Sequence, residues 1–135
     1  MRLRFALPLF TALMQAKGGS VASAHVAGPH GLVGWTFSDP VEGQGPLPMR
    51  LVITRNGKVL RRISGDPFLW KWIFEADGSQ VAIESGPLHG SMNCMLIDLR
   101  SGTETQRYDC FRQAPPDAPQ WVKDLEGSAS LNLLP

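Results

Sequence analysis

The sequence predicts an all-β fold, a small antiparallel meander of three hairpins followed by one short C-terminal helix. Composition is the first reason: 14 glycines and 11 prolines in 135 residues are many, and both residue types interrupt helices. Short apolar or alternating runs across residues 49–110 are the second reason. The third is the turn signals between these runs, Asn56-Gly57, Asp77-Gly78 and Ser101-Gly102.

The first 24 residues are typical of a cleaved secretion signal. Two arginines precede an apolar run over residues 5–14, and the small residues Ala22-Ser23-Ala24 end the segment. We therefore expect cleavage between Ala24 and His25, and a mature protein in the periplasm or outside the cell. A surface amphipathic helix is the alternative, because Lys17 interrupts the signal pattern. No transmembrane segment is expected after signal removal, since spanning a bilayer takes about 20 apolar residues.

Charge argues against nucleic acid as a partner. Loss of residues 1–24 removes 3 of the 13 basic residues and none of the 12 acidic ones, which leaves 10 against 12 and a net charge of −2. Proteins that bind nucleic acid use a basic surface to neutralise phosphates. The adjacent pair Arg61-Arg62 lies among strand residues and is interpreted as part of a solvated strand face.

Residues 25–48 are rich in glycine and proline, and only Leu32 to Phe37 has the pattern of a strand there. An antiparallel β domain is expected over residues 49–127. Its first hairpin joins 49–54 to 59–64 through Asn56-Gly57, which suits a type I′ turn. Equal spacing about the turn sets the expected partners: Thr54 with Val59, Ile53 with Leu60, and Leu51 with Arg62.

The second hairpin joins residues 69–74 to 79–85 through Asp77-Gly78. Counting outward from this turn pairs Phe74 with Val81 and Trp72 with Ile83. Side chains two apart on a strand share a face, so Trp70 is expected beside Trp72. These five apolar residues form one face, which is the best candidate for the core.

The third hairpin joins residues 91–99 to 104–110 and contains both cysteines of the chain. With the loop centred on Gly102, Cys94 and Cys110 stand directly opposite each other, and a shift of two residues leaves them diagonal. An exported chain with two cysteines favours a disulfide, which closes about 17 residues and stabilises the fold by roughly 3 kcal/mol. The alternative, a metal held by both thiolates, needs two further ligands.

A proline-rich run over residues 115–119 leads into a predicted helix from Gln120 to Glu126. Asp117 is the expected N-cap, and a glycine follows the last turn. A helix of two turns is marginal alone, so Trp121 and Leu125, which share one face, are expected to pack it on the sheet. Residues 128–135 are expected to form a tail.

A repeat of about 37 residues runs through the chain, since Trp35-Thr36-Phe37 and Trp72-Ile73-Phe74 share one spacing. Residues 74–82 and the later run 96–102 resemble the blade repeat of TolB-type periplasmic β-propellers, a likeness that covers residues 69–110. The resemblance implies a propeller-blade-like meander, although Ala76 stands where that family has proline. A closed propeller needs at least about four blades and this chain holds two at most, so an open sandwich is the other arrangement expected.

Two rival functions depend on histidines. His25 becomes the first residue after cleavage, and its α-amino group and ring nitrogen can chelate Cu(II) with an imidazole from His30 or His89. This is similar to the histidine brace of small periplasmic copper carriers and copper oxygenases, but the carriers' acidic residue ahead of the second histidine is missing. A mobile terminus at His25 is the alternative.

The second rival is a small hydrolase in which His89 acts with Ser85 or Ser91 and with Asp98. Strand geometry separates these residues, which favours a loop histidine that caps a turn.

Phosphate-binding loops, metalloprotease histidine pairs and nucleophile elbows are missing from the sequence. We therefore expect an exported, non-catalytic module without a cofactor that acts through a binding or interaction surface, with another envelope or secreted protein as its partner. Trp35 and Trp121 lie outside the expected core strands, and aromatic residues are common anchors of interfaces. Core packing is the alternative for both.

Overall fold

A computed structural model describes residues 19–128, and within them the chain forms two antiparallel sheets and one helix. The predicted all-β meander with a short C-terminal helix is therefore confirmed. The first sheet contains β1 (Val21–Ala22), β2 (Val26–Ala27), β3 (Leu32–Val41), β4 (Gly45–Arg55) and β5 (Lys58–Ser64). The second sheet contains β6 (Phe68–Glu75), β7 (Gln80–Gly86), β8 (Asn93–Asp98) and β9 (Glu104–Asp109), and α2 (Gln120–Gly127) follows.

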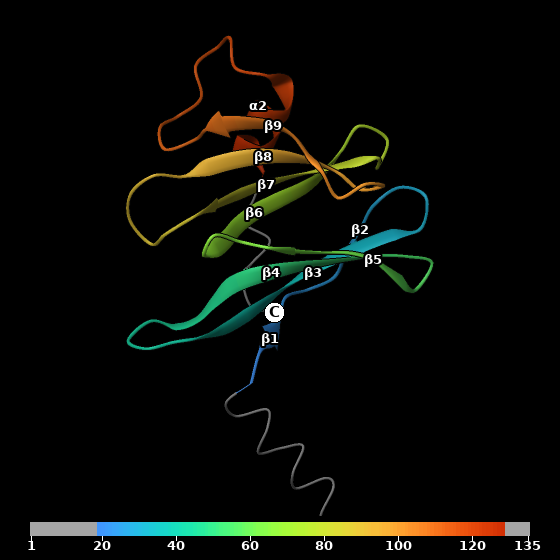
Figure 1. The fold of residues 1–135 in the computed structure, drawn as a ribbon, viewed down its shortest axis with the longest axis horizontal. Helices are drawn as coiled ribbons and strands as arrows, with labels where there is room; N and C mark the ends of the chain where they lie inside the picture. The colour runs from blue at the N-terminus through green and yellow to red at the C-terminus, as the bar shows by residue number, and fades with distance from the viewer. Residues whose placement is uncertain (1–18, 129–135) are drawn as a thin grey trace, which may run out of the picture.

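Figure 1 shows the two sheets and the helix as three layers. A hydrophobic core lies between the sheets, and a second lies between the second sheet and the helix. Successive side chains of a strand point to opposite faces, so β7 and β8 contribute to both cores. The core between the sheets contains Leu32, Leu51, Ile53, Leu69, Trp72, Val81, Ile83, Ile97 and Leu99. The core under α2 contains Ala82, Cys94, Leu96, Ala118, Trp121, Val122 and Leu125. The predicted packing of Trp121 and Leu125 onto the sheet is confirmed.

The β3–β4 hairpin shows that residues 25–48 hold more than the one predicted strand, because β2, β3 and the beginning of β4 all lie there. Proline cannot donate a ladder hydrogen bond and is confined to strand edges and bulges. Pro40 pairs with Pro46 in a part of the β3–β4 hairpin that neither β1 nor β5 reaches. The two prolines have no N–H, and no further strand pairs there to need one. Pro48 lies next to a register shift at Phe37 and Ser38.

The β4–β5 turn has positive φ angles at Asn56 and Gly57, 50° and 84°, as the predicted turn requires. Thr54 pairs with Val59 as expected, but the rest of the predicted register is wrong. A register shift next to Thr54 gives different partners: Ile53 pairs with Arg61 rather than Leu60, and Leu51 with Ile63 rather than Arg62. Such a bulge adds one residue to one strand, and local turn signals do not reveal it.

The β6–β7 hairpin pairs Phe74 with Val81 and Trp72 with Ile83, as predicted. Trp70 is the exception to the predicted core face, because a register shift lies between Leu69 and Lys71. Leu69 packs into the core between the sheets instead of Trp70. The indole N–H of Trp70 donates a 3.0 Å hydrogen bond to the carbonyl oxygen of Gly86.

Cys94 and Cys110 form the predicted disulfide, with 5.8 Å between their Cα atoms. The predicted direct opposition is wrong: Cys94 pairs with Tyr108, so the bond runs diagonally to Cys110, just beyond the end of β9. At the turn Ile97 pairs with Glu104, three residues from the predicted register, and a register shift between Leu96 and Ile97 reduces this offset to two. A displacement of two residues keeps both cysteines on the face toward α2, so the bond still closes.

The helix has Pro119 as its N-cap, and no side chain of the described residues caps its first turn, so the predicted N-cap Asp117 is wrong. Asp117 lies instead in a turn that the amide of Ala118 closes onto the carbonyl oxygen of Pro115, at 3.0 Å. The carbonyl oxygen of Pro119 begins the first turn by accepting hydrogen bonds from the amides of Val122, at 3.0 Å, and Lys123, at 3.3 Å.

Most of the predicted secretion signal, residues 1–18, and the predicted tail beyond Ser128 lie outside the described residues. Val21–Ala22 pair with Ser38 and Phe37 as β1, and the hydroxyl of the buried Ser23 accepts a 2.9 Å hydrogen bond from the amide of Thr36. The predicted cleavage after Ala24 would remove this short edge strand. Within residues 19–128, no helix is long and apolar enough to cross a membrane.

Candidate functional site

Two hollows flank the segment that leaves the second sheet after β9. One, of about 520 Å³, is lined by Leu88, His89, Met92 and Phe111 with neighbouring residues. The other, of about 390 Å³, is lined by Tyr108, Asp109, Phe111, Arg112, Gln113 and Pro115. Phe111 lines both hollows and therefore lies at their common border. We call this region the Phe111 surface, made of Glu84, Leu88, His89, Met92, Tyr108, Phe111 and Arg112.

The backbone beneath Phe111 is held in place on both sides. The disulfide joins Cys110 to β8, and the amide of Cys110 donates a 2.9 Å hydrogen bond to the carbonyl oxygen of Met92. The amide of Phe111 donates to the carboxylate of Asp109 at 3.0 Å. A segment fixed in this way loses little conformational freedom on binding, which favours recognition.

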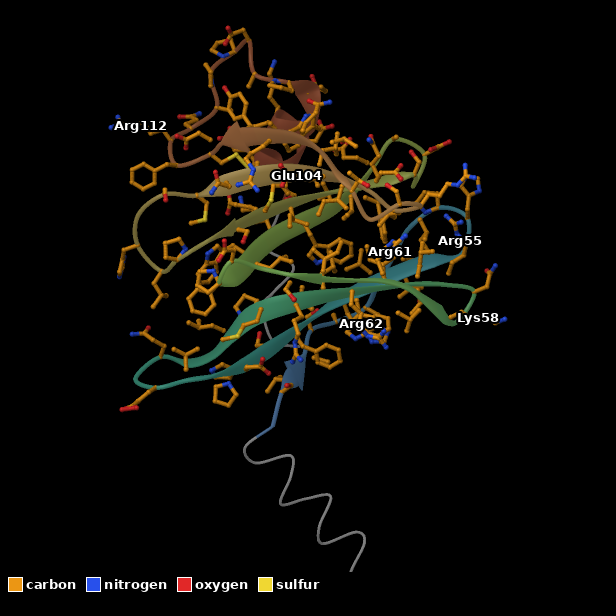
Figure 2. The ribbon with its side chains drawn as sticks, viewed as in Figure 1. Arg55, Lys58, Arg61, Arg62, Glu104 and Arg112 are labelled. Carbon is orange, nitrogen blue, oxygen red and sulfur yellow. A yellow bond between two sulfur atoms is a disulfide. The ribbon has the colours of Figure 1, made fainter. Side chains whose placement is uncertain are left out.

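Phe111 is the most exposed large apolar side chain in residues 19–128, with 56% of its surface accessible, and Leu88 nearby is 39% exposed. Exposed aromatic side chains beside concave surfaces are typical anchors of protein interfaces. Arg112 adds a long cationic side chain, a type that is also enriched at interfaces. Figure 2 shows Arg112 at one end of the molecule, where it can meet a partner.

Glu84 lies in a narrow crevice between the disulfide and α2, beside Tyr108, Arg112 and Glu126. Burial raises the pKa of its carboxyl, with Lys71 opposing and Glu126 adding to the effect. A raised pKa is common for acid–base residues. The residues lining this crevice include neither serine nor histidine, however, and both its cysteines are in the disulfide.

The structure places the three candidate copper ligands in different regions. The ring of His25 stacks on Trp35, with 4.1 Å between centroids. His30 lines a hollow with Arg55 and Asp77, and His89 belongs to the Phe111 surface. Within residues 19–128, no three His, Cys, Asp or Glu side chains are grouped to hold a metal ion.

The candidate Ser-His-Asp set is not assembled either. Asp98 pairs with Gln80 at one end of the β7–β8 ladder and Ser85 with Asn93 at the other, roughly 17 Å away. The Ser85 hydroxyl accepts a 2.7 Å hydrogen bond from the amide of Asp66. The Asp98 carboxylate accepts two bonds of 2.8 Å from Ser101.

The two candidate interface tryptophans are both packed against other residues. Trp121 is 7% exposed, belongs to the core under α2 and donates its indole N–H to Gln106 at 2.9 Å. Trp35 is partly buried and stacks with His25. Sequence reasoning missed Phe111 and Leu88. The available signal was that Phe111 directly follows a cross-linked cysteine, outside the alternating strands.

Comparisons with protein families, with curated proteins and with solved structures find no match to this chain. The kinship with propeller blades therefore stays a prediction, although each sheet contains an antiparallel meander.

Proposed function

We propose that this protein is an exported, non-catalytic β module that binds another envelope or secreted protein through the Phe111 surface. The observation that carries the proposal is the exposure of Phe111 on a cross-linked segment between two hollows. Covering the exposed 56% of Phe111 removes apolar area from water and contributes about 1–2 kcal/mol to association. The hollows on either side accept apolar groups of the partner, and His89 and Arg112 form a polar rim.

Export is supported by the disulfide, because such bonds persist in oxidising compartments and are rare in the cytosol. The three-part layout of residues 1–24 supports it independently. The test is the intact mass of protein recovered from the cell envelope or the medium. A chain that starts at His25 and carries the disulfide is the expected result, and a cytosolic chain that starts at Met1 with two thiols contradicts export.

The binding role is tested by photo-crosslinking in the cells that make the protein. A benzophenone amino acid replaces Phe111 in one variant and Val59 in a matched variant, because Val59 is also apolar and 47% exposed but lies on β5. We expect one discrete crosslinked protein from position 111, competed by excess unlabelled protein, and none from position 59. Equal crosslinking at both positions, or none at either, contradicts the proposal.

A further inference from the structure

A second candidate site lies at the other end of the sandwich, where the tips of three hairpins meet. A groove of about 550 Å³ is lined by Arg55, Leu60, Ser79, Asp98, Leu99 and Arg100, which we call the basic groove. An adjoining hollow of about 380 Å³ adds His30, Asp77 and Gly78 and shares Arg55 and Ser79. Figure 2 shows Arg55, Lys58 and Arg61 together at this end, far from Arg112.

The walls of the basic groove are fixed by hydrogen bonds between the hairpin tips. The amide of Leu99 donates to the carbonyl oxygen of Ser79 at 3.0 Å, which joins the β8–β9 tip to the β6–β7 tip. The guanidinium of Arg61 donates to the carbonyl oxygen of Leu99 at 2.8 Å and also to that of Arg100, which joins β5 to the same tip. The groove is therefore formed before a ligand enters.

The charges at this end are unbalanced. Four cations, Arg55, Lys58, Arg61 and Arg100, lie on the strands and tips around it, against the two carboxylates of Asp77 and Asp98. Hydrogen bonds from Ser101 lower the pKa of Asp98 and occupy one of its oxygens. The side chains of Arg55 and Lys58 have no hydrogen-bond or ion-pair partner among the described residues. Arg55 is thus a free cation on the wall of both hollows.

The lining combines three kinds of recognition chemistry. Guanidinium groups such as Arg55 and Arg100 present planar donors that match the oxygens of a phosphate. The carboxylate of Asp77 and the hydroxyl of Ser79 accept hydrogen bonds, which suits ligand hydroxyl groups. Leu60, which is partly buried, adds a small apolar surface for a ring face. A bare anion needs only the first of these, whereas a ligand with a phosphate and several hydroxyls uses all three.

We propose that the basic groove and the adjoining hollow together bind phosphorylated sugars, with Arg55 and Arg100 holding the phosphate and Asp77 and Ser79 receiving sugar hydroxyls. The phosphate belongs either to a free sugar phosphate or to a phosphorylated polyol headgroup of a lipid, since the same atoms are recognised in both. This site is independent of the Phe111 surface, at the opposite end of the molecule.

The test is a titration of the disulfide-bonded protein, followed by calorimetry and by amide chemical shifts. Glucose 1-phosphate is expected to bind and to shift the amides of residues 77–79 and 98–100, whereas glucose and glucuronate bind at least about tenfold more weakly. Arg55→Ala and Arg100→Ala should each weaken binding about tenfold or more. Arg62→Ala removes the same charge from a position that does not line the groove, and it should leave binding within about twofold.

Vesicles of phosphatidylcholine with and without phosphatidylinositol 4-phosphate distinguish a lipid headgroup from a free sugar phosphate as the source of the ligand. Binding to the phosphorylated vesicles that is lost in Arg55→Ala supports the lipid source, and binding of soluble glucose 1-phosphate alone supports the free one. Absence of both contradicts the proposal. Equal losses in Arg55→Ala and Arg62→Ala, or equally tight binding of polyglutamate, also contradict it, because they indicate a diffuse basic surface.

Discussion

The indole N–H of Trp121 donates a 2.9 Å hydrogen bond to the side-chain oxygen of Gln106, across the junction between α2 and β9. The ring itself is buried in the core under the helix. We expect Trp121→Ala to lower the free energy of unfolding by about 3–5 kcal/mol, because it removes a large buried side chain and leaves a cavity. Gln106→Ala removes only the hydrogen-bond partner and should cost about 1 kcal/mol. Urea denaturation followed by circular dichroism measures both, and similar losses in the two variants would contradict this packing.

The disulfide is the second contributor to stability that can be tested. Replacing both cysteines, Cys94→Ala with Cys110→Ala, should lower the free energy of unfolding by roughly 3 kcal/mol, since the unfolded chain loses a closed loop of about 17 residues. Thiol titration of native wild-type protein provides the control. Two reactive thiols in that protein would show that the bond is not formed.

Thr36 offers a substitution that should stabilise the protein. Its side-chain hydroxyl is fully buried between the sheets and has no hydrogen-bond partner among the described residues. Thr36→Val keeps the shape and removes the unpaired polar group, so we expect a gain of about 1 kcal/mol in unfolding free energy. Ser85→Ala is the matched control and should lower the free energy of unfolding, because the buried Ser85 hydroxyl accepts a hydrogen bond from the amide of Asp66. A loss of stability in Thr36→Val would show that the hydroxyl has a partner.

Two carboxyl groups near the helix, those of Glu75 and Glu84, predict that the stability of the protein depends on pH. Burial and the neighbouring Asp124 raise the pKa of Glu75 above its ordinary 4.5. Burial, with a contribution from Glu126, also raises the pKa of Glu84. A folded-state pKa above the unfolded one means that the folded protein holds the proton more tightly. The stability from these groups is therefore complete below pH 4.5 and is lost as pH rises through their raised pKa values.

Asp98 and Glu104 act in the opposite direction, because hydrogen bonds from Ser101 and Arg107 lower their pKa values. Their contribution is lost at lower pH, so the melting temperature should rise from about pH 7 to about pH 5 and fall below about pH 4. Scanning calorimetry of Glu75→Gln with Glu84→Gln should show a flatter rise, and Glu42→Gln in the exposed β3–β4 turn should follow the wild type. Parallel curves for wild type and double variant would contradict the assignment.

The sequence predicts which residues form most of the strands, because turn residues and alternation are local signals. Asn56 and Gly57 adopt the expected positive φ angles, and Trp72 faces Ile83 as counted from its turn. Register is not local: a bulge at Thr54 displaces the partner of Leu51, and a β8–β9 turn centred before Gly102 displaces the partner of Cys94. Packing between the sheets and the helix decides where an extra residue is accommodated, and a count from the turn assumes there is none.

The candidate site was harder to predict than the fold. Trp121 and Phe111 are both aromatic residues outside the predicted core strands, and hydrophobicity alone does not separate them. The difference comes from tertiary packing. The helix α2 places Trp121 against Ala82 and Leu96, whereas Phe111 follows the end of β9 and stays exposed among the described residues. The basic groove likewise depends on three hairpin tips that are distant in sequence.

The affinity of the crosslinked partner for two alanine variants tests the central claim most directly. Phe111→Ala should weaken binding about 30-fold or more, the effect of losing an interface anchor worth about 2 kcal/mol. Val59→Ala, at an exposed apolar side chain on β5 outside the Phe111 surface, should leave the affinity within about twofold. Equal affinities for wild type and Phe111→Ala, with both proteins folded by circular dichroism, would contradict a binding function at the Phe111 surface.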